Sequence, residues 1–508
     1  MNYLKFSDLG ENIKLEHTMY GEGVITNVSR HIVTIRFEDG VIRRFPIANV
    51  LNNRYFNVLS DEAFDNVKIE RITIKKLFDE LNNDFVIDNT NNISVLTAPN
   101  GCGKTTTFKL LMFALAPSIE NFKDAMSVPF EEFSCFINNG KKIVIKKKKE
   151  RINSFNNRNL DLSSAPLLSN YSDLTYELFN DNQRIESISF EESARNSTMH
   201  NSFYEMDDEY RRDMQDIGMN REISSFITKI YTILEKNKCR AYIDFIEANR
   251  IQKDTKSIRE EINRGIRHAR DDFYEKLDYL SEANDEIISY VRKCLADYNR
   301  KLVEAKTKLP EKYISAQDDI DENDYNAFKT RWDDYHNELK KYYEIGLLDS
   351  TDTVIKSSEL KTAFAKKSSF LTTYLDVFEP TIEPLQKAYS KMKLLADIFN
   401  KRNKITKKTI KFNQSGICII SHEKPIDINN LSSGEKNDLI MFYRLIFKTV
   451  KNGIVLIDEP EISLHIEWQE EYLDHLMDIC RMNNLQAIVA THSPSIINGH
   501  LELFIDKR

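Results

Sequence analysis

The sequence predicts an α/β fold that is interrupted by a helical insertion and preceded by a small β-domain. The first observation is an apolar run at 454–457 that leads straight into Asp458 and Glu459, as a buried parallel strand does when it ends at a polar edge. The second is a glycine-rich turn at 98–106 between a strand-like run and a helical pattern. The third is a stretch at 255–405 in which apolar residues recur every three or four positions. A chain of 508 residues has room for several domains of roughly 150 residues each.

Composition narrows the class of protein. Charged residues make up 30% and hydrophobic residues 41% of the chain, as is typical of a soluble globular protein, and the formal net charge of −8 argues against a surface that coats nucleic acid. The six cysteines lack paired or metal-type spacing, which argues against a disulfide framework and a zinc site. No apolar run approaches the roughly 18 residues of a membrane helix, and the first residues lack the apolar core of a signal peptide. We therefore expect a cytoplasmic protein without a membrane partner.

Residues 1–60 are expected to form a separate small barrel of the SH3 or Tudor kind. Apolar and polar residues alternate here, as at Val33, Ile35 and Phe37, and Asp39–Gly40 is a strong hairpin signal. Such a barrel could bind protein or nucleic acid, or serve as a structural addition. The sequence leaves these roles open.

Two basic runs, 141–151 and 401–411, stand out against the negative net charge. Lysines are common on solvated edge strands, where they prevent edge-to-edge pairing. They are also the residues that contact nucleic-acid phosphates, so double-stranded DNA is an open possibility as a partner.

The turn at 98–106 has the features of a phosphate-binding loop. Gly101 and Gly103 leave room for backbone N–H groups to surround a phosphate, and the helix that follows adds its positive dipole end. Lys104 can reach the β- and γ-phosphates of a nucleotide, and the Thr105 hydroxyl can hold Mg²⁺. Ala98 stands where the usual pattern has its first glycine. The predicted nucleotide ligands are Asn100, Gly101, Cys102, Gly103, Lys104, Thr105 and Thr106.

Two acids after a buried strand are costly unless a positive charge compensates them. Mg²⁺ on a nucleotide is that charge, with Asp458 as a metal ligand beside Thr105. Glu459 would then orient and deprotonate an attacking water as general base.

Two further stretches point to the same chemistry. Ser432, Ser433 and Gly434 precede an apolar helix, where hydroxyl groups and free amides form a second anion site. His492 follows another apolar strand at 487–490. The stretch 241–251 is also expected to form a strand; Arg250 ends it and could point toward the nucleotide, although a surface ion pair is the simpler interpretation.

The organisation between these motifs is read from periodicity. We expect one half of a nucleotide-binding head at 66–254, a helical or coiled-coil insertion at 255–405, and the other half of the head at 406–508. Within the first half, the Asn- and Ser-rich stretch 152–201 is expected to form loops. The insertion is expected to be an antiparallel hairpin, with a compact helical lid as the alternative. The apolar positions are Phe273, Leu277, Leu280, Ile287, Val291, Leu295, Tyr298 and Leu302, and on the return Ile382, Leu385, Tyr389, Met392 and Phe399.

In this order, the phosphate loop, "LSSGEK", "IDEPE" and "ATHS" resemble the motifs of an ABC-type P-loop ATPase head of the SMC-like branch. The resemblance implies a Mg²⁺-dependent ATPase that works as a homodimer or higher oligomer. In it, Ser432 and Gly434 of one subunit contact the ATP of the other, His492 senses the γ-phosphate, and Glu459 is the hydrolytic base. His465 stands where many such proteins carry an acid, which leaves communication through that loop open, and no glutamine matches the usual metal-side loop.

The phrases "DEPEISLHIEWQ" and "LFDELNNDFVID" are similar to a narrower group. These are bacterial antiphage-defence ATPases of the Septu type, including retron-associated PtuA-like proteins, with the PARIS and OLD ATPases as relatives. The resemblance covers residues 66–508 and implies an ATP-driven sensor or switch that controls a separate effector, expected to be a nuclease. We recognise no HNH-type nuclease motif in this chain. The alternatives are a DNA repair ATPase of the RecF-like kind and, less compatible with the long insertion, a transporter subunit.

Overall fold

The computed structural model of the chain describes residues 14–17, 21–28, 32–37, 41–46, 56–58, 66–97, 101–149, 171–191, 208–247, 279–315, 325–350, 359–413, 416–464 and 466–505. The chain forms two compact units. One contains residues 1–253 and 449–508, and the other contains residues 254–448. In the described part of the chain, no helix has both the length and the apolar character that a membrane crossing requires.

A four-stranded parallel sheet forms the centre of the first unit. Its strand order is β13 (Ile243–Ile246), β17 (Ile454–Asp458), β18 (Gln486–Thr491) and β8 (Ile93–Thr97). Every residue of β17 and β18 is buried, which explains the uninterrupted apolar runs in the sequence. Asp458 pairs with Ala490, and Thr491 pairs with Thr97, so three strands reach their carboxyl ends at the same edge. In open sheets of this kind, ligands bind beyond that edge.

Helices that follow these strands complete the parallel layer. Helix α2 (Lys104–Leu115) begins directly after the glycine-rich turn, and its side chains Phe108 and Phe113 are fully buried. Helix α3 (Ile119–Ser127) follows with Ser118 as its N-cap. After β17 come η7 (Pro460–Ser463), α11 (Ile466–Glu470) and α12 (Tyr472–Asn483), and after β18 comes α13 (Pro494–Ile497). The short η8 (Leu501–Leu503) precedes Phe504, which bridges to Val95 of β8.

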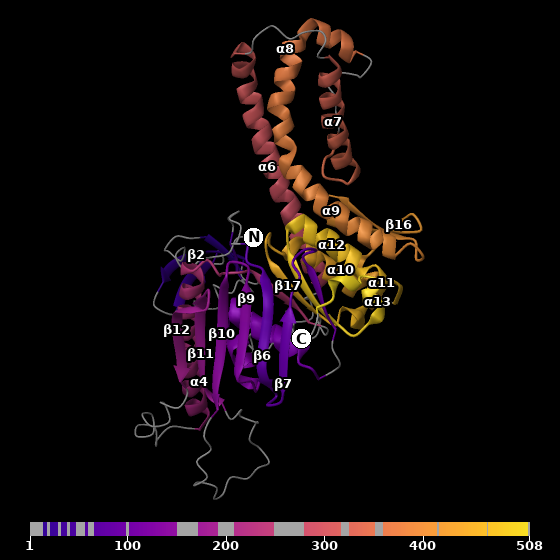
Figure 1. The fold of residues 1–508 in the computed structure, drawn as a ribbon. Coiled ribbons are helices and arrows are strands. Elements are labelled where there is room, and N and C mark those ends of the chain that lie inside the picture. The colour runs from indigo at the N-terminus through magenta and orange to yellow at the C-terminus, as the bar shows by residue number, and fades with distance from the viewer. Residues whose placement is uncertain are drawn as a thin grey trace, which may run out of the picture. The chain divides into compact units, whose positions relative to one another are not determined.

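A six-stranded antiparallel sheet lies in the same unit, and its strands stand side by side in Figure 1. Helix α4 (Asp208–Lys236) contributes Phe226 and Tyr231 to the core that this sheet shares. The strand order is β12 (Gln183–Glu191), β11 (Tyr171–Asn180), β10 (Lys141–Lys149), β9 (Glu132–Ile137), β6 (Ile69–Leu77) and β7 (Leu81–Val86).

Gln486 joins the two sheets of the first unit. Its side-chain oxygen accepts a hydrogen bond from the Ile69 backbone N–H at 2.8 Å, and its amide nitrogen donates to the Ile69 carbonyl at 2.8 Å. The same nitrogen donates to Asn89 Oδ1 at 2.5 Å. The amide of Gln486 thus pairs with β6 as a neighbouring strand would, and its buried polar atoms are satisfied.

Two expectations for this sheet are wrong. The run at 141–149 forms the interior strand β10 and not an edge strand, because β9 and β11 pair with its two sides. The stretch 152–201, expected to form loops, contains the hairpin β11–β12. This hairpin turns at Asp181 and Asn182, which both have positive φ, and buries Leu174, Tyr176 and Leu178. The rest of that stretch lies outside the described residues.

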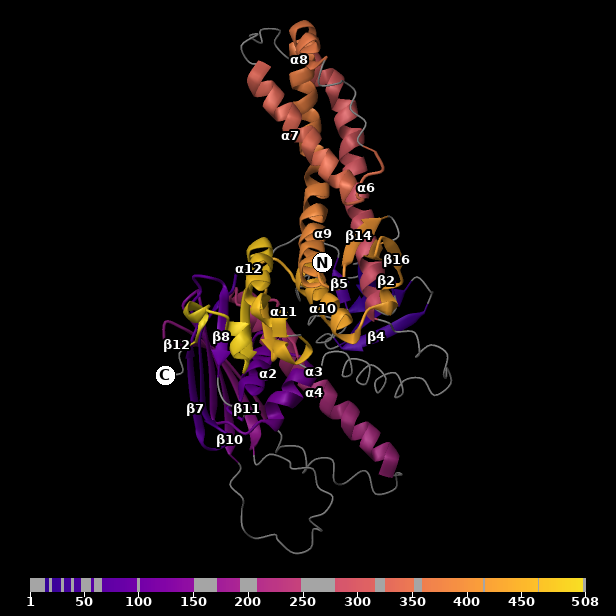
Figure 2. The same ribbon diagram turned by 90° about the vertical axis from the view of Figure 1, so that its right-hand side faces the viewer.

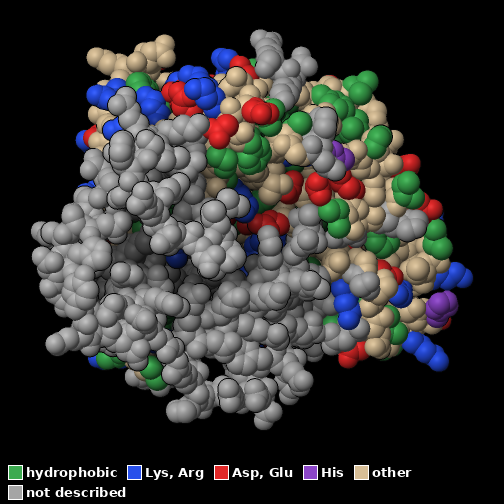
Figure 3. All heavy atoms as spheres, turned by 90° about the horizontal axis from the view of Figure 1, so that it is seen from below, with side chains coloured by type: hydrophobic (Ala, Val, Ile, Leu, Met, Phe, Trp, Pro, Cys, Tyr) green, Lys and Arg blue, Asp and Glu red, His purple; other side chains and the backbone are tan. Residues whose placement is uncertain are grey.

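The lysines of β10 are largely used inside the protein. Lys147 is buried and donates to the carbonyl oxygens of Met126 and Val128 at 2.7 and 2.6 Å, where it closes the C-terminal end of α3. Lys146 pairs with Glu177 at 2.7 Å. Lys142 lies over the rings of Phe136 and Phe179, and Lys141 donates to the Asn237 carbonyl. The run therefore offers less free charge to nucleic acid than its sequence suggests. On the described part of the face that Figure 3 shows, both basic and acidic side chains are present.

At the N-terminus, the described residues form a five-stranded antiparallel sheet. Its order is β4 (Ile42–Pro46), β3 (Ile32–Phe37), β2 (Gly21–Val28), β1 (Lys14–His17) and β5 (Phe56–Val58). Val33, Ile35 and Phe37 of β3 are buried, as their alternation predicts. Closure of this sheet into a barrel stays a prediction, and the Asp39–Gly40 turn lies outside the described residues.

The second unit is mainly helical. Helices α6 (Tyr279–Ser315) and α8 (Leu360–Phe378) run side by side in Figures 1 and 2, and α7 (Tyr325–Glu344) lies against α8. After α8, the chain passes through η4 (Glu379–Ile382) into α9 (Glu383–Arg402), which packs on α6. Aromatic side chains fill the interface, among them Phe328, Trp332 and Phe364. The described residues of the stretch 255–405 are mainly helical. Phe273 and Leu277 lie outside the described residues, and an insertion built as a coiled coil stays a prediction.

A small sheet and a helix close the second unit. The sheet consists of β14 (Lys408–Asn413), β15 (Gly416–Ser421) and β16 (Lys424–Ile426), so the basic run at 401–411 does end in an edge strand. Beyond η5 (Ile428–Asn430), helix α10 (Ser433–Tyr443) continues into the π-helical turn η6 (Arg444–Lys448). Arg402 of α9 and Asp438 of α10 form a fully buried ion pair at 2.5 Å, which fastens α10 to the end of the long helices.

Candidate nucleotide site

A pocket of about 180 Å³ lies at the carboxyl edge of the parallel sheet. Residues from three separate parts of the sequence meet in it: the turn before α2, the end of β17 and the end of β18. The hairpin between β6 and β7 adds a fourth wall. The lining residues are Phe78, Gly101, Cys102, Gly103, Lys104, Thr105, Thr106, Glu459 and His492.

The turn before α2 has the backbone of an anion-binding loop. Gly101 and Gly103 have φ angles of +84° and +81°, a conformation that side chains with a Cβ rarely adopt. A Cβ at Gly103 would collide with Leu77, whereas nothing lies within 4 Å of a Cβ built at Gly101. Asn83 Nδ2 donates to the Cys102 carbonyl at 3.1 Å and holds the loop from β7. Gly101, Cys102 and Thr106, which the sequence suggests as nucleotide ligands, line the pocket, while Asn100 and Ala98 lie outside the described residues.

Lys104 is the main positive charge in the pocket, although only 6% of its surface is exposed. Burial lowers the pKa of its ammonium group, and the charges of Glu459 and Asp458 oppose that shift. Its Nζ contacts Nε2 of His492. A desolvated ammonium group at a helix N-terminus interacts strongly with phosphate, because little water screens it.

Asp458 and Thr105 form the polar pair that the sequence predicts for a metal. Thr105 Oγ1 donates to Asp458 Oδ2 at 2.5 Å, and Asp458 Oδ1 is buried without a hydrogen-bond partner among the described residues. Burial raises the pKa of the Asp458 carboxyl, and the Thr105 hydrogen bond opposes the rise. An orphaned carboxylate oxygen beside a hydroxyl group fits the oxygen ligands that Mg²⁺ prefers.

Glu459 and His492 face each other across the pocket. His492 Nε2 lies 3.6 Å from Glu459 Oε1, and each side chain keeps 30% of its surface exposed. Glu459 has a φ of +45°, the left-handed conformation that is costly for a residue with a Cβ. Such strain persists where the surrounding structure enforces it, often at functional sites. Here it turns the carboxylate out of the buried strand and into the pocket.

The serine motif lies in the other compact unit. Ser432 is exposed and caps α10 by accepting from the Glu435 N–H at 3.3 Å, while Glu435 accepts from the Ser432 N–H at 2.8 Å. Lys408 pairs with Glu435 at 2.8 Å, which fixes this cap to β14. Among the described residues, no atom lies within 4 Å of a Cβ built at Gly434. Nothing is described for the Ser433 side chain.

Sequence reasoning missed several residues around the pocket. Phe78 and Asn83 come from the β6–β7 hairpin, and Glu461 and Gln469 follow the acid pair. All four stand inside quoted phrases, Phe78 and Asn83 in "LFDELNNDFVID" and Glu461 and Gln469 in "DEPEISLHIEWQ", but those phrases gave none of them a role. His465 and Arg250, which the sequence singled out, lie outside the described residues.

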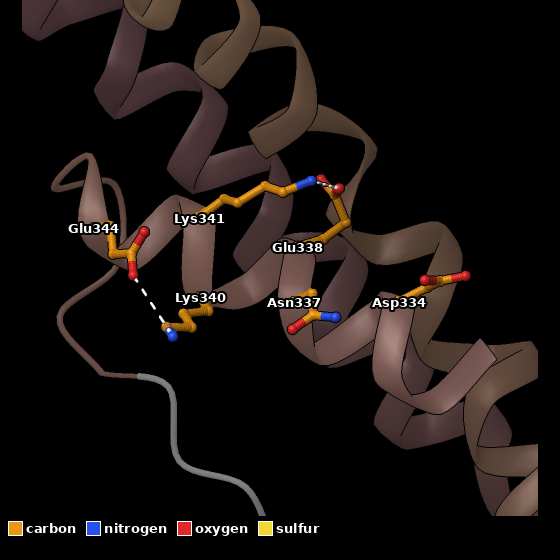
Figure 4. A pocket seen from close by; sticks show the side chains of 6 residues that line it. All are labelled: Asp334, Asn337, Glu338, Lys340, Lys341 and Glu344. Atoms are coloured by element: carbon orange, nitrogen blue, oxygen red, sulfur yellow. Dashed lines mark hydrogen bonds and ion pairs between the residues drawn. The ribbon is translucent and has the colours of Figure 1, made fainter. Parts of the chain in front are cut away.

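A larger hollow of about 380 Å³ lies on α7, away from this chemistry. Figure 4 shows that one helix supplies its lining. Lys341 pairs with Glu338 at 2.6 Å and Lys340 with Glu344 at 3.8 Å, so much of its charge is already compensated. It is a solvated helix face and does not resemble a ligand site.

Known proteins resemble parts of this chain. A "Retron Vc95 probable ATPase" of Vibrio cholerae serotype O1 biovar El Tor is 33% identical over 92 residues, 16% of this chain and 18% of that protein. "Protein ea59" of Escherichia phage lambda is 37% identical over 67 residues, 13% of each chain. The matches thus span less than a fifth of these curated relatives.

A solved structure and a protein family also match this chain. The structure is an SMC head bound to the C-winged helix domain of ScpA, with a TM-score of 0.31 and 13% identity over 85% of this chain and 91% of that one. A likeness at that score carries no argument. The AAA ATPase domain family matches residues 68–497, a range that includes the phosphate loop, the acid pair and His492. This chain therefore belongs to the AAA ATPase domain family.

Proposed function

We propose that the chain is a Mg²⁺-dependent, ATP-hydrolysing switch with an SMC-like head. The observation that carries this proposal is the convergence of Lys104, Thr105, Glu459 and His492 in one pocket, with Asp458 bonded to Thr105 behind it. These residues are far apart in the sequence, and each offers a group that phosphoryl transfer to water requires.

Each side chain has a distinct task in the proposed reaction. The loop amides and Lys104 bind the β- and γ-phosphates, for which the Lys104 ammonium must leave the His492 ring. Thr105 and Asp458 hold Mg²⁺, which neutralises charge on the phosphate oxygens. Glu459 accepts the proton of the attacking water, and His492 donates a hydrogen bond to the γ-phosphate.

The proposed site is completed by a second copy of the chain. Ser432 and Gly434 of one subunit contact the γ-phosphate bound by the other, so that ATP closes a pair of heads and hydrolysis reopens it. The exposed start of α10 supports this role, because the Ser432 hydroxyl accepts a hydrogen bond in the capping box and still has its own proton to donate to an anion. The domain division at 1–60, 66–254, 255–405 and 406–508 belongs to the same proposal.

We place this switch in a bacterial antiphage defence system of the Septu or retron-associated kind. There it would sense infection and control a separate effector, expected to be a nuclease. The similarity to a retron ATPase supports this assignment over a limited stretch. A RecF-like repair ATPase is the alternative that the experiments below must exclude.

ATP turnover by the purified full-length chain tests the chemistry. Wild-type protein should hydrolyse ATP with Mg²⁺, and Lys104→Ala should lose nucleotide binding in calorimetry with a non-hydrolysable analogue. Lys123→Ala, an exposed lysine of α3, is the matched control and should behave as wild type. Unchanged affinity in Lys104→Ala would remove this loop from the nucleotide site.

A plaque assay tests the biological role. Cells that carry the native gene neighbourhood should resist phage with the wild-type gene and lose resistance with Lys104→Ala. Sensitivity to DNA damage instead of phage in the same variant would favour the repair alternative.

A further inference from the structure

The loops that follow β17 and β18 lie next to each other at the carboxyl edge of the sheet. The two strands are parallel neighbours, with Asp458 opposite Ala490. The first loop carries Glu459 and then η7, and the second carries His492 and Ser493. The Glu459 N–H donates to the Ala490 carbonyl at 2.8 Å, so the backbone pairing of β17 with β18 extends to Glu459. Two groups of the proposed ATPase site thus stand on adjacent loops.

Two side chains connect these loops. Glu461 Oε1 accepts a hydrogen bond from the His492 backbone N–H at 2.8 Å. Gln469 Oε1 accepts from Ser493 Oγ at 2.6 Å, while Gln469 Nε2 donates to the Leu464 carbonyl at 3.1 Å. The His492 backbone is therefore attached to η7 through Glu461, and the Ser493 side chain is attached to α11 through Gln469.

Glu461 carries a cost that a purely structural contact would not require. Its second carboxylate oxygen, Oε2, is buried and has no hydrogen-bond partner among the described residues. A buried carboxylate oxygen in that state costs free energy, and a smaller or neutral residue would avoid the cost. The contact that Glu461 does make is to the residue whose ring meets Lys104 and Glu459.

We infer that Glu461 is a positioning residue that holds His492 over the pocket, with Gln469 as a second tie. The inference rests on the proposed ATP hydrolysis at this site. Because Glu461 bonds to the backbone of His492, it fixes the position of the backbone from which the imidazole extends. The groups that line the pocket fix the orientation of the ring. A displacement of about 1 Å in a reacting group can lower a rate about a hundredfold, so such a tie affects turnover more than binding.

Steady-state kinetics on the full chain separate this role from folding. Glu461→Ala removes the acceptor and should lower kcat about ten- to a hundredfold, with KM changed less than about threefold. Glu461→Gln keeps an oxygen acceptor for the His492 N–H, so its kcat should return to within about threefold of wild type. Glu467→Gln, an exposed acid on the neighbouring α11, is the control and should leave kcat unchanged. Thermal unfolding of each variant verifies that it is folded.

A double variant identifies the route of the effect. If Glu461 acts through His492, adding Glu461→Ala to His492→Ala should lower kcat no further. Additive losses would overturn the inference, as would equal losses in folded Glu461→Ala and Glu461→Gln, because the charge itself would then matter. Gln469→Ala should show the same dependence on His492 with a smaller loss.

Hydrogen exchange measured by mass spectrometry tests the contact without any turnover. The His492 amide should exchange about fivefold faster in Glu461→Ala than in wild type or Glu461→Gln. Wild-type protein that hydrolyses no ATP would refute the proposed function, yet this measurement would still support or refute the tie. Equal exchange in all three proteins would refute the tie even where ATP is hydrolysed.

Discussion

Asp458 and Glu459 are adjacent in the chain but stand in different surroundings. Asp458 ends a fully buried strand, and its Oδ1 has no hydrogen-bond partner within the described part of the chain. Glu459 turns out of that strand through a left-handed backbone angle and keeps part of its carboxylate in water. The two environments suit two tasks, since a metal ligand benefits from burial whereas a base needs access to the attacking water.

The first prediction concerns Glu459. Glu459→Gln should bind ATP with near wild-type affinity and lose about a hundred- to ten-thousandfold in turnover, because the amide keeps the shape and removes the base. Closed pairs of heads should accumulate with ATP, as size-exclusion chromatography with light scattering would show. Wild-type turnover in this variant would exclude Glu459 as the base.

The second prediction concerns Asp458 and pH. Because burial raises the carboxyl's pKa in the folded chain, the stability that Asp458 contributes is full in acid and is lost as pH rises through that pKa. Asp458→Asn cannot ionise, so without nucleotide it should be more stable than wild type by about 1 kcal/mol at pH 7. The difference should disappear in acid, and Mg²⁺-supported turnover should be lost. A less stable variant at pH 7 would contradict this reasoning, which thermal unfolding across pH can decide.

At the scale of an element, two glycines of the loop before α2 differ in one contact, so substitutions at the two positions can be compared directly. Gly101 and Gly103 have nearly the same positive φ, but only Gly103 lies against Leu77. Gly101→Ala should cost about 1 kcal/mol of unfolding free energy for the backbone angle alone. Gly103→Ala should cost about 2 to 4 kcal/mol, because overpacking is added to the angle. Denaturant unfolding measures both, and equal losses would show that the contact with Leu77 relaxes without cost.

The strands and helix around the phosphate loop could be predicted because their signals are local. Ile93–Thr97, the turn and Lys104–Leu115 are continuous in sequence, and β17 and β18 are plain apolar runs. The sheet order was not predictable from such signals. A lysine-rich interior strand such as β10 has the same sequence pattern as an edge strand. Only its pairing with β9 and β11 shows that β10 is interior.

The missed parts of the site have the same origin. Asn83 reaches Cys102, and Glu461 reaches His492 across 31 positions, so each contact depends on how strands are arranged in space. The Asp181–Asn182 turn did carry a local signal, two residues that tolerate positive φ, but the Asn- and Ser-rich surroundings obscured it.

At the scale of the whole molecule, the proposed site requires two chains. Lys104→Ala and Ser432→Arg should each be inactive alone. In a mixed dimer, one composite site carries both substitutions and the other carries neither, so partial ATPase activity should return on mixing. Mixing two samples of the same variant is the control.

If both sites must act together, the mixture stays inactive and a crosslink decides. Cysteines introduced at Thr106 and Ser432 should link two chains in the presence of ATP. A link formed only within one chain would exclude the shared site.

The amide of Gln486 gives the first unit a chemical weak point. Its nitrogen donates to two oxygens, the Ile69 carbonyl and Asn89 Oδ1, while its own oxygen accepts from the Ile69 N–H. Deamidation, which exchanges one NH₂ for oxygen, would place a carboxylate against both acceptors. Gln486→Glu reproduces that lesion and should cost about 2 to 4 kcal/mol in denaturant unfolding, whereas Gln486→Met should cost less because it leaves no charge buried. Loss of these hydrogen bonds would therefore weaken the seam between the parallel sheet and the antiparallel sheet beside it.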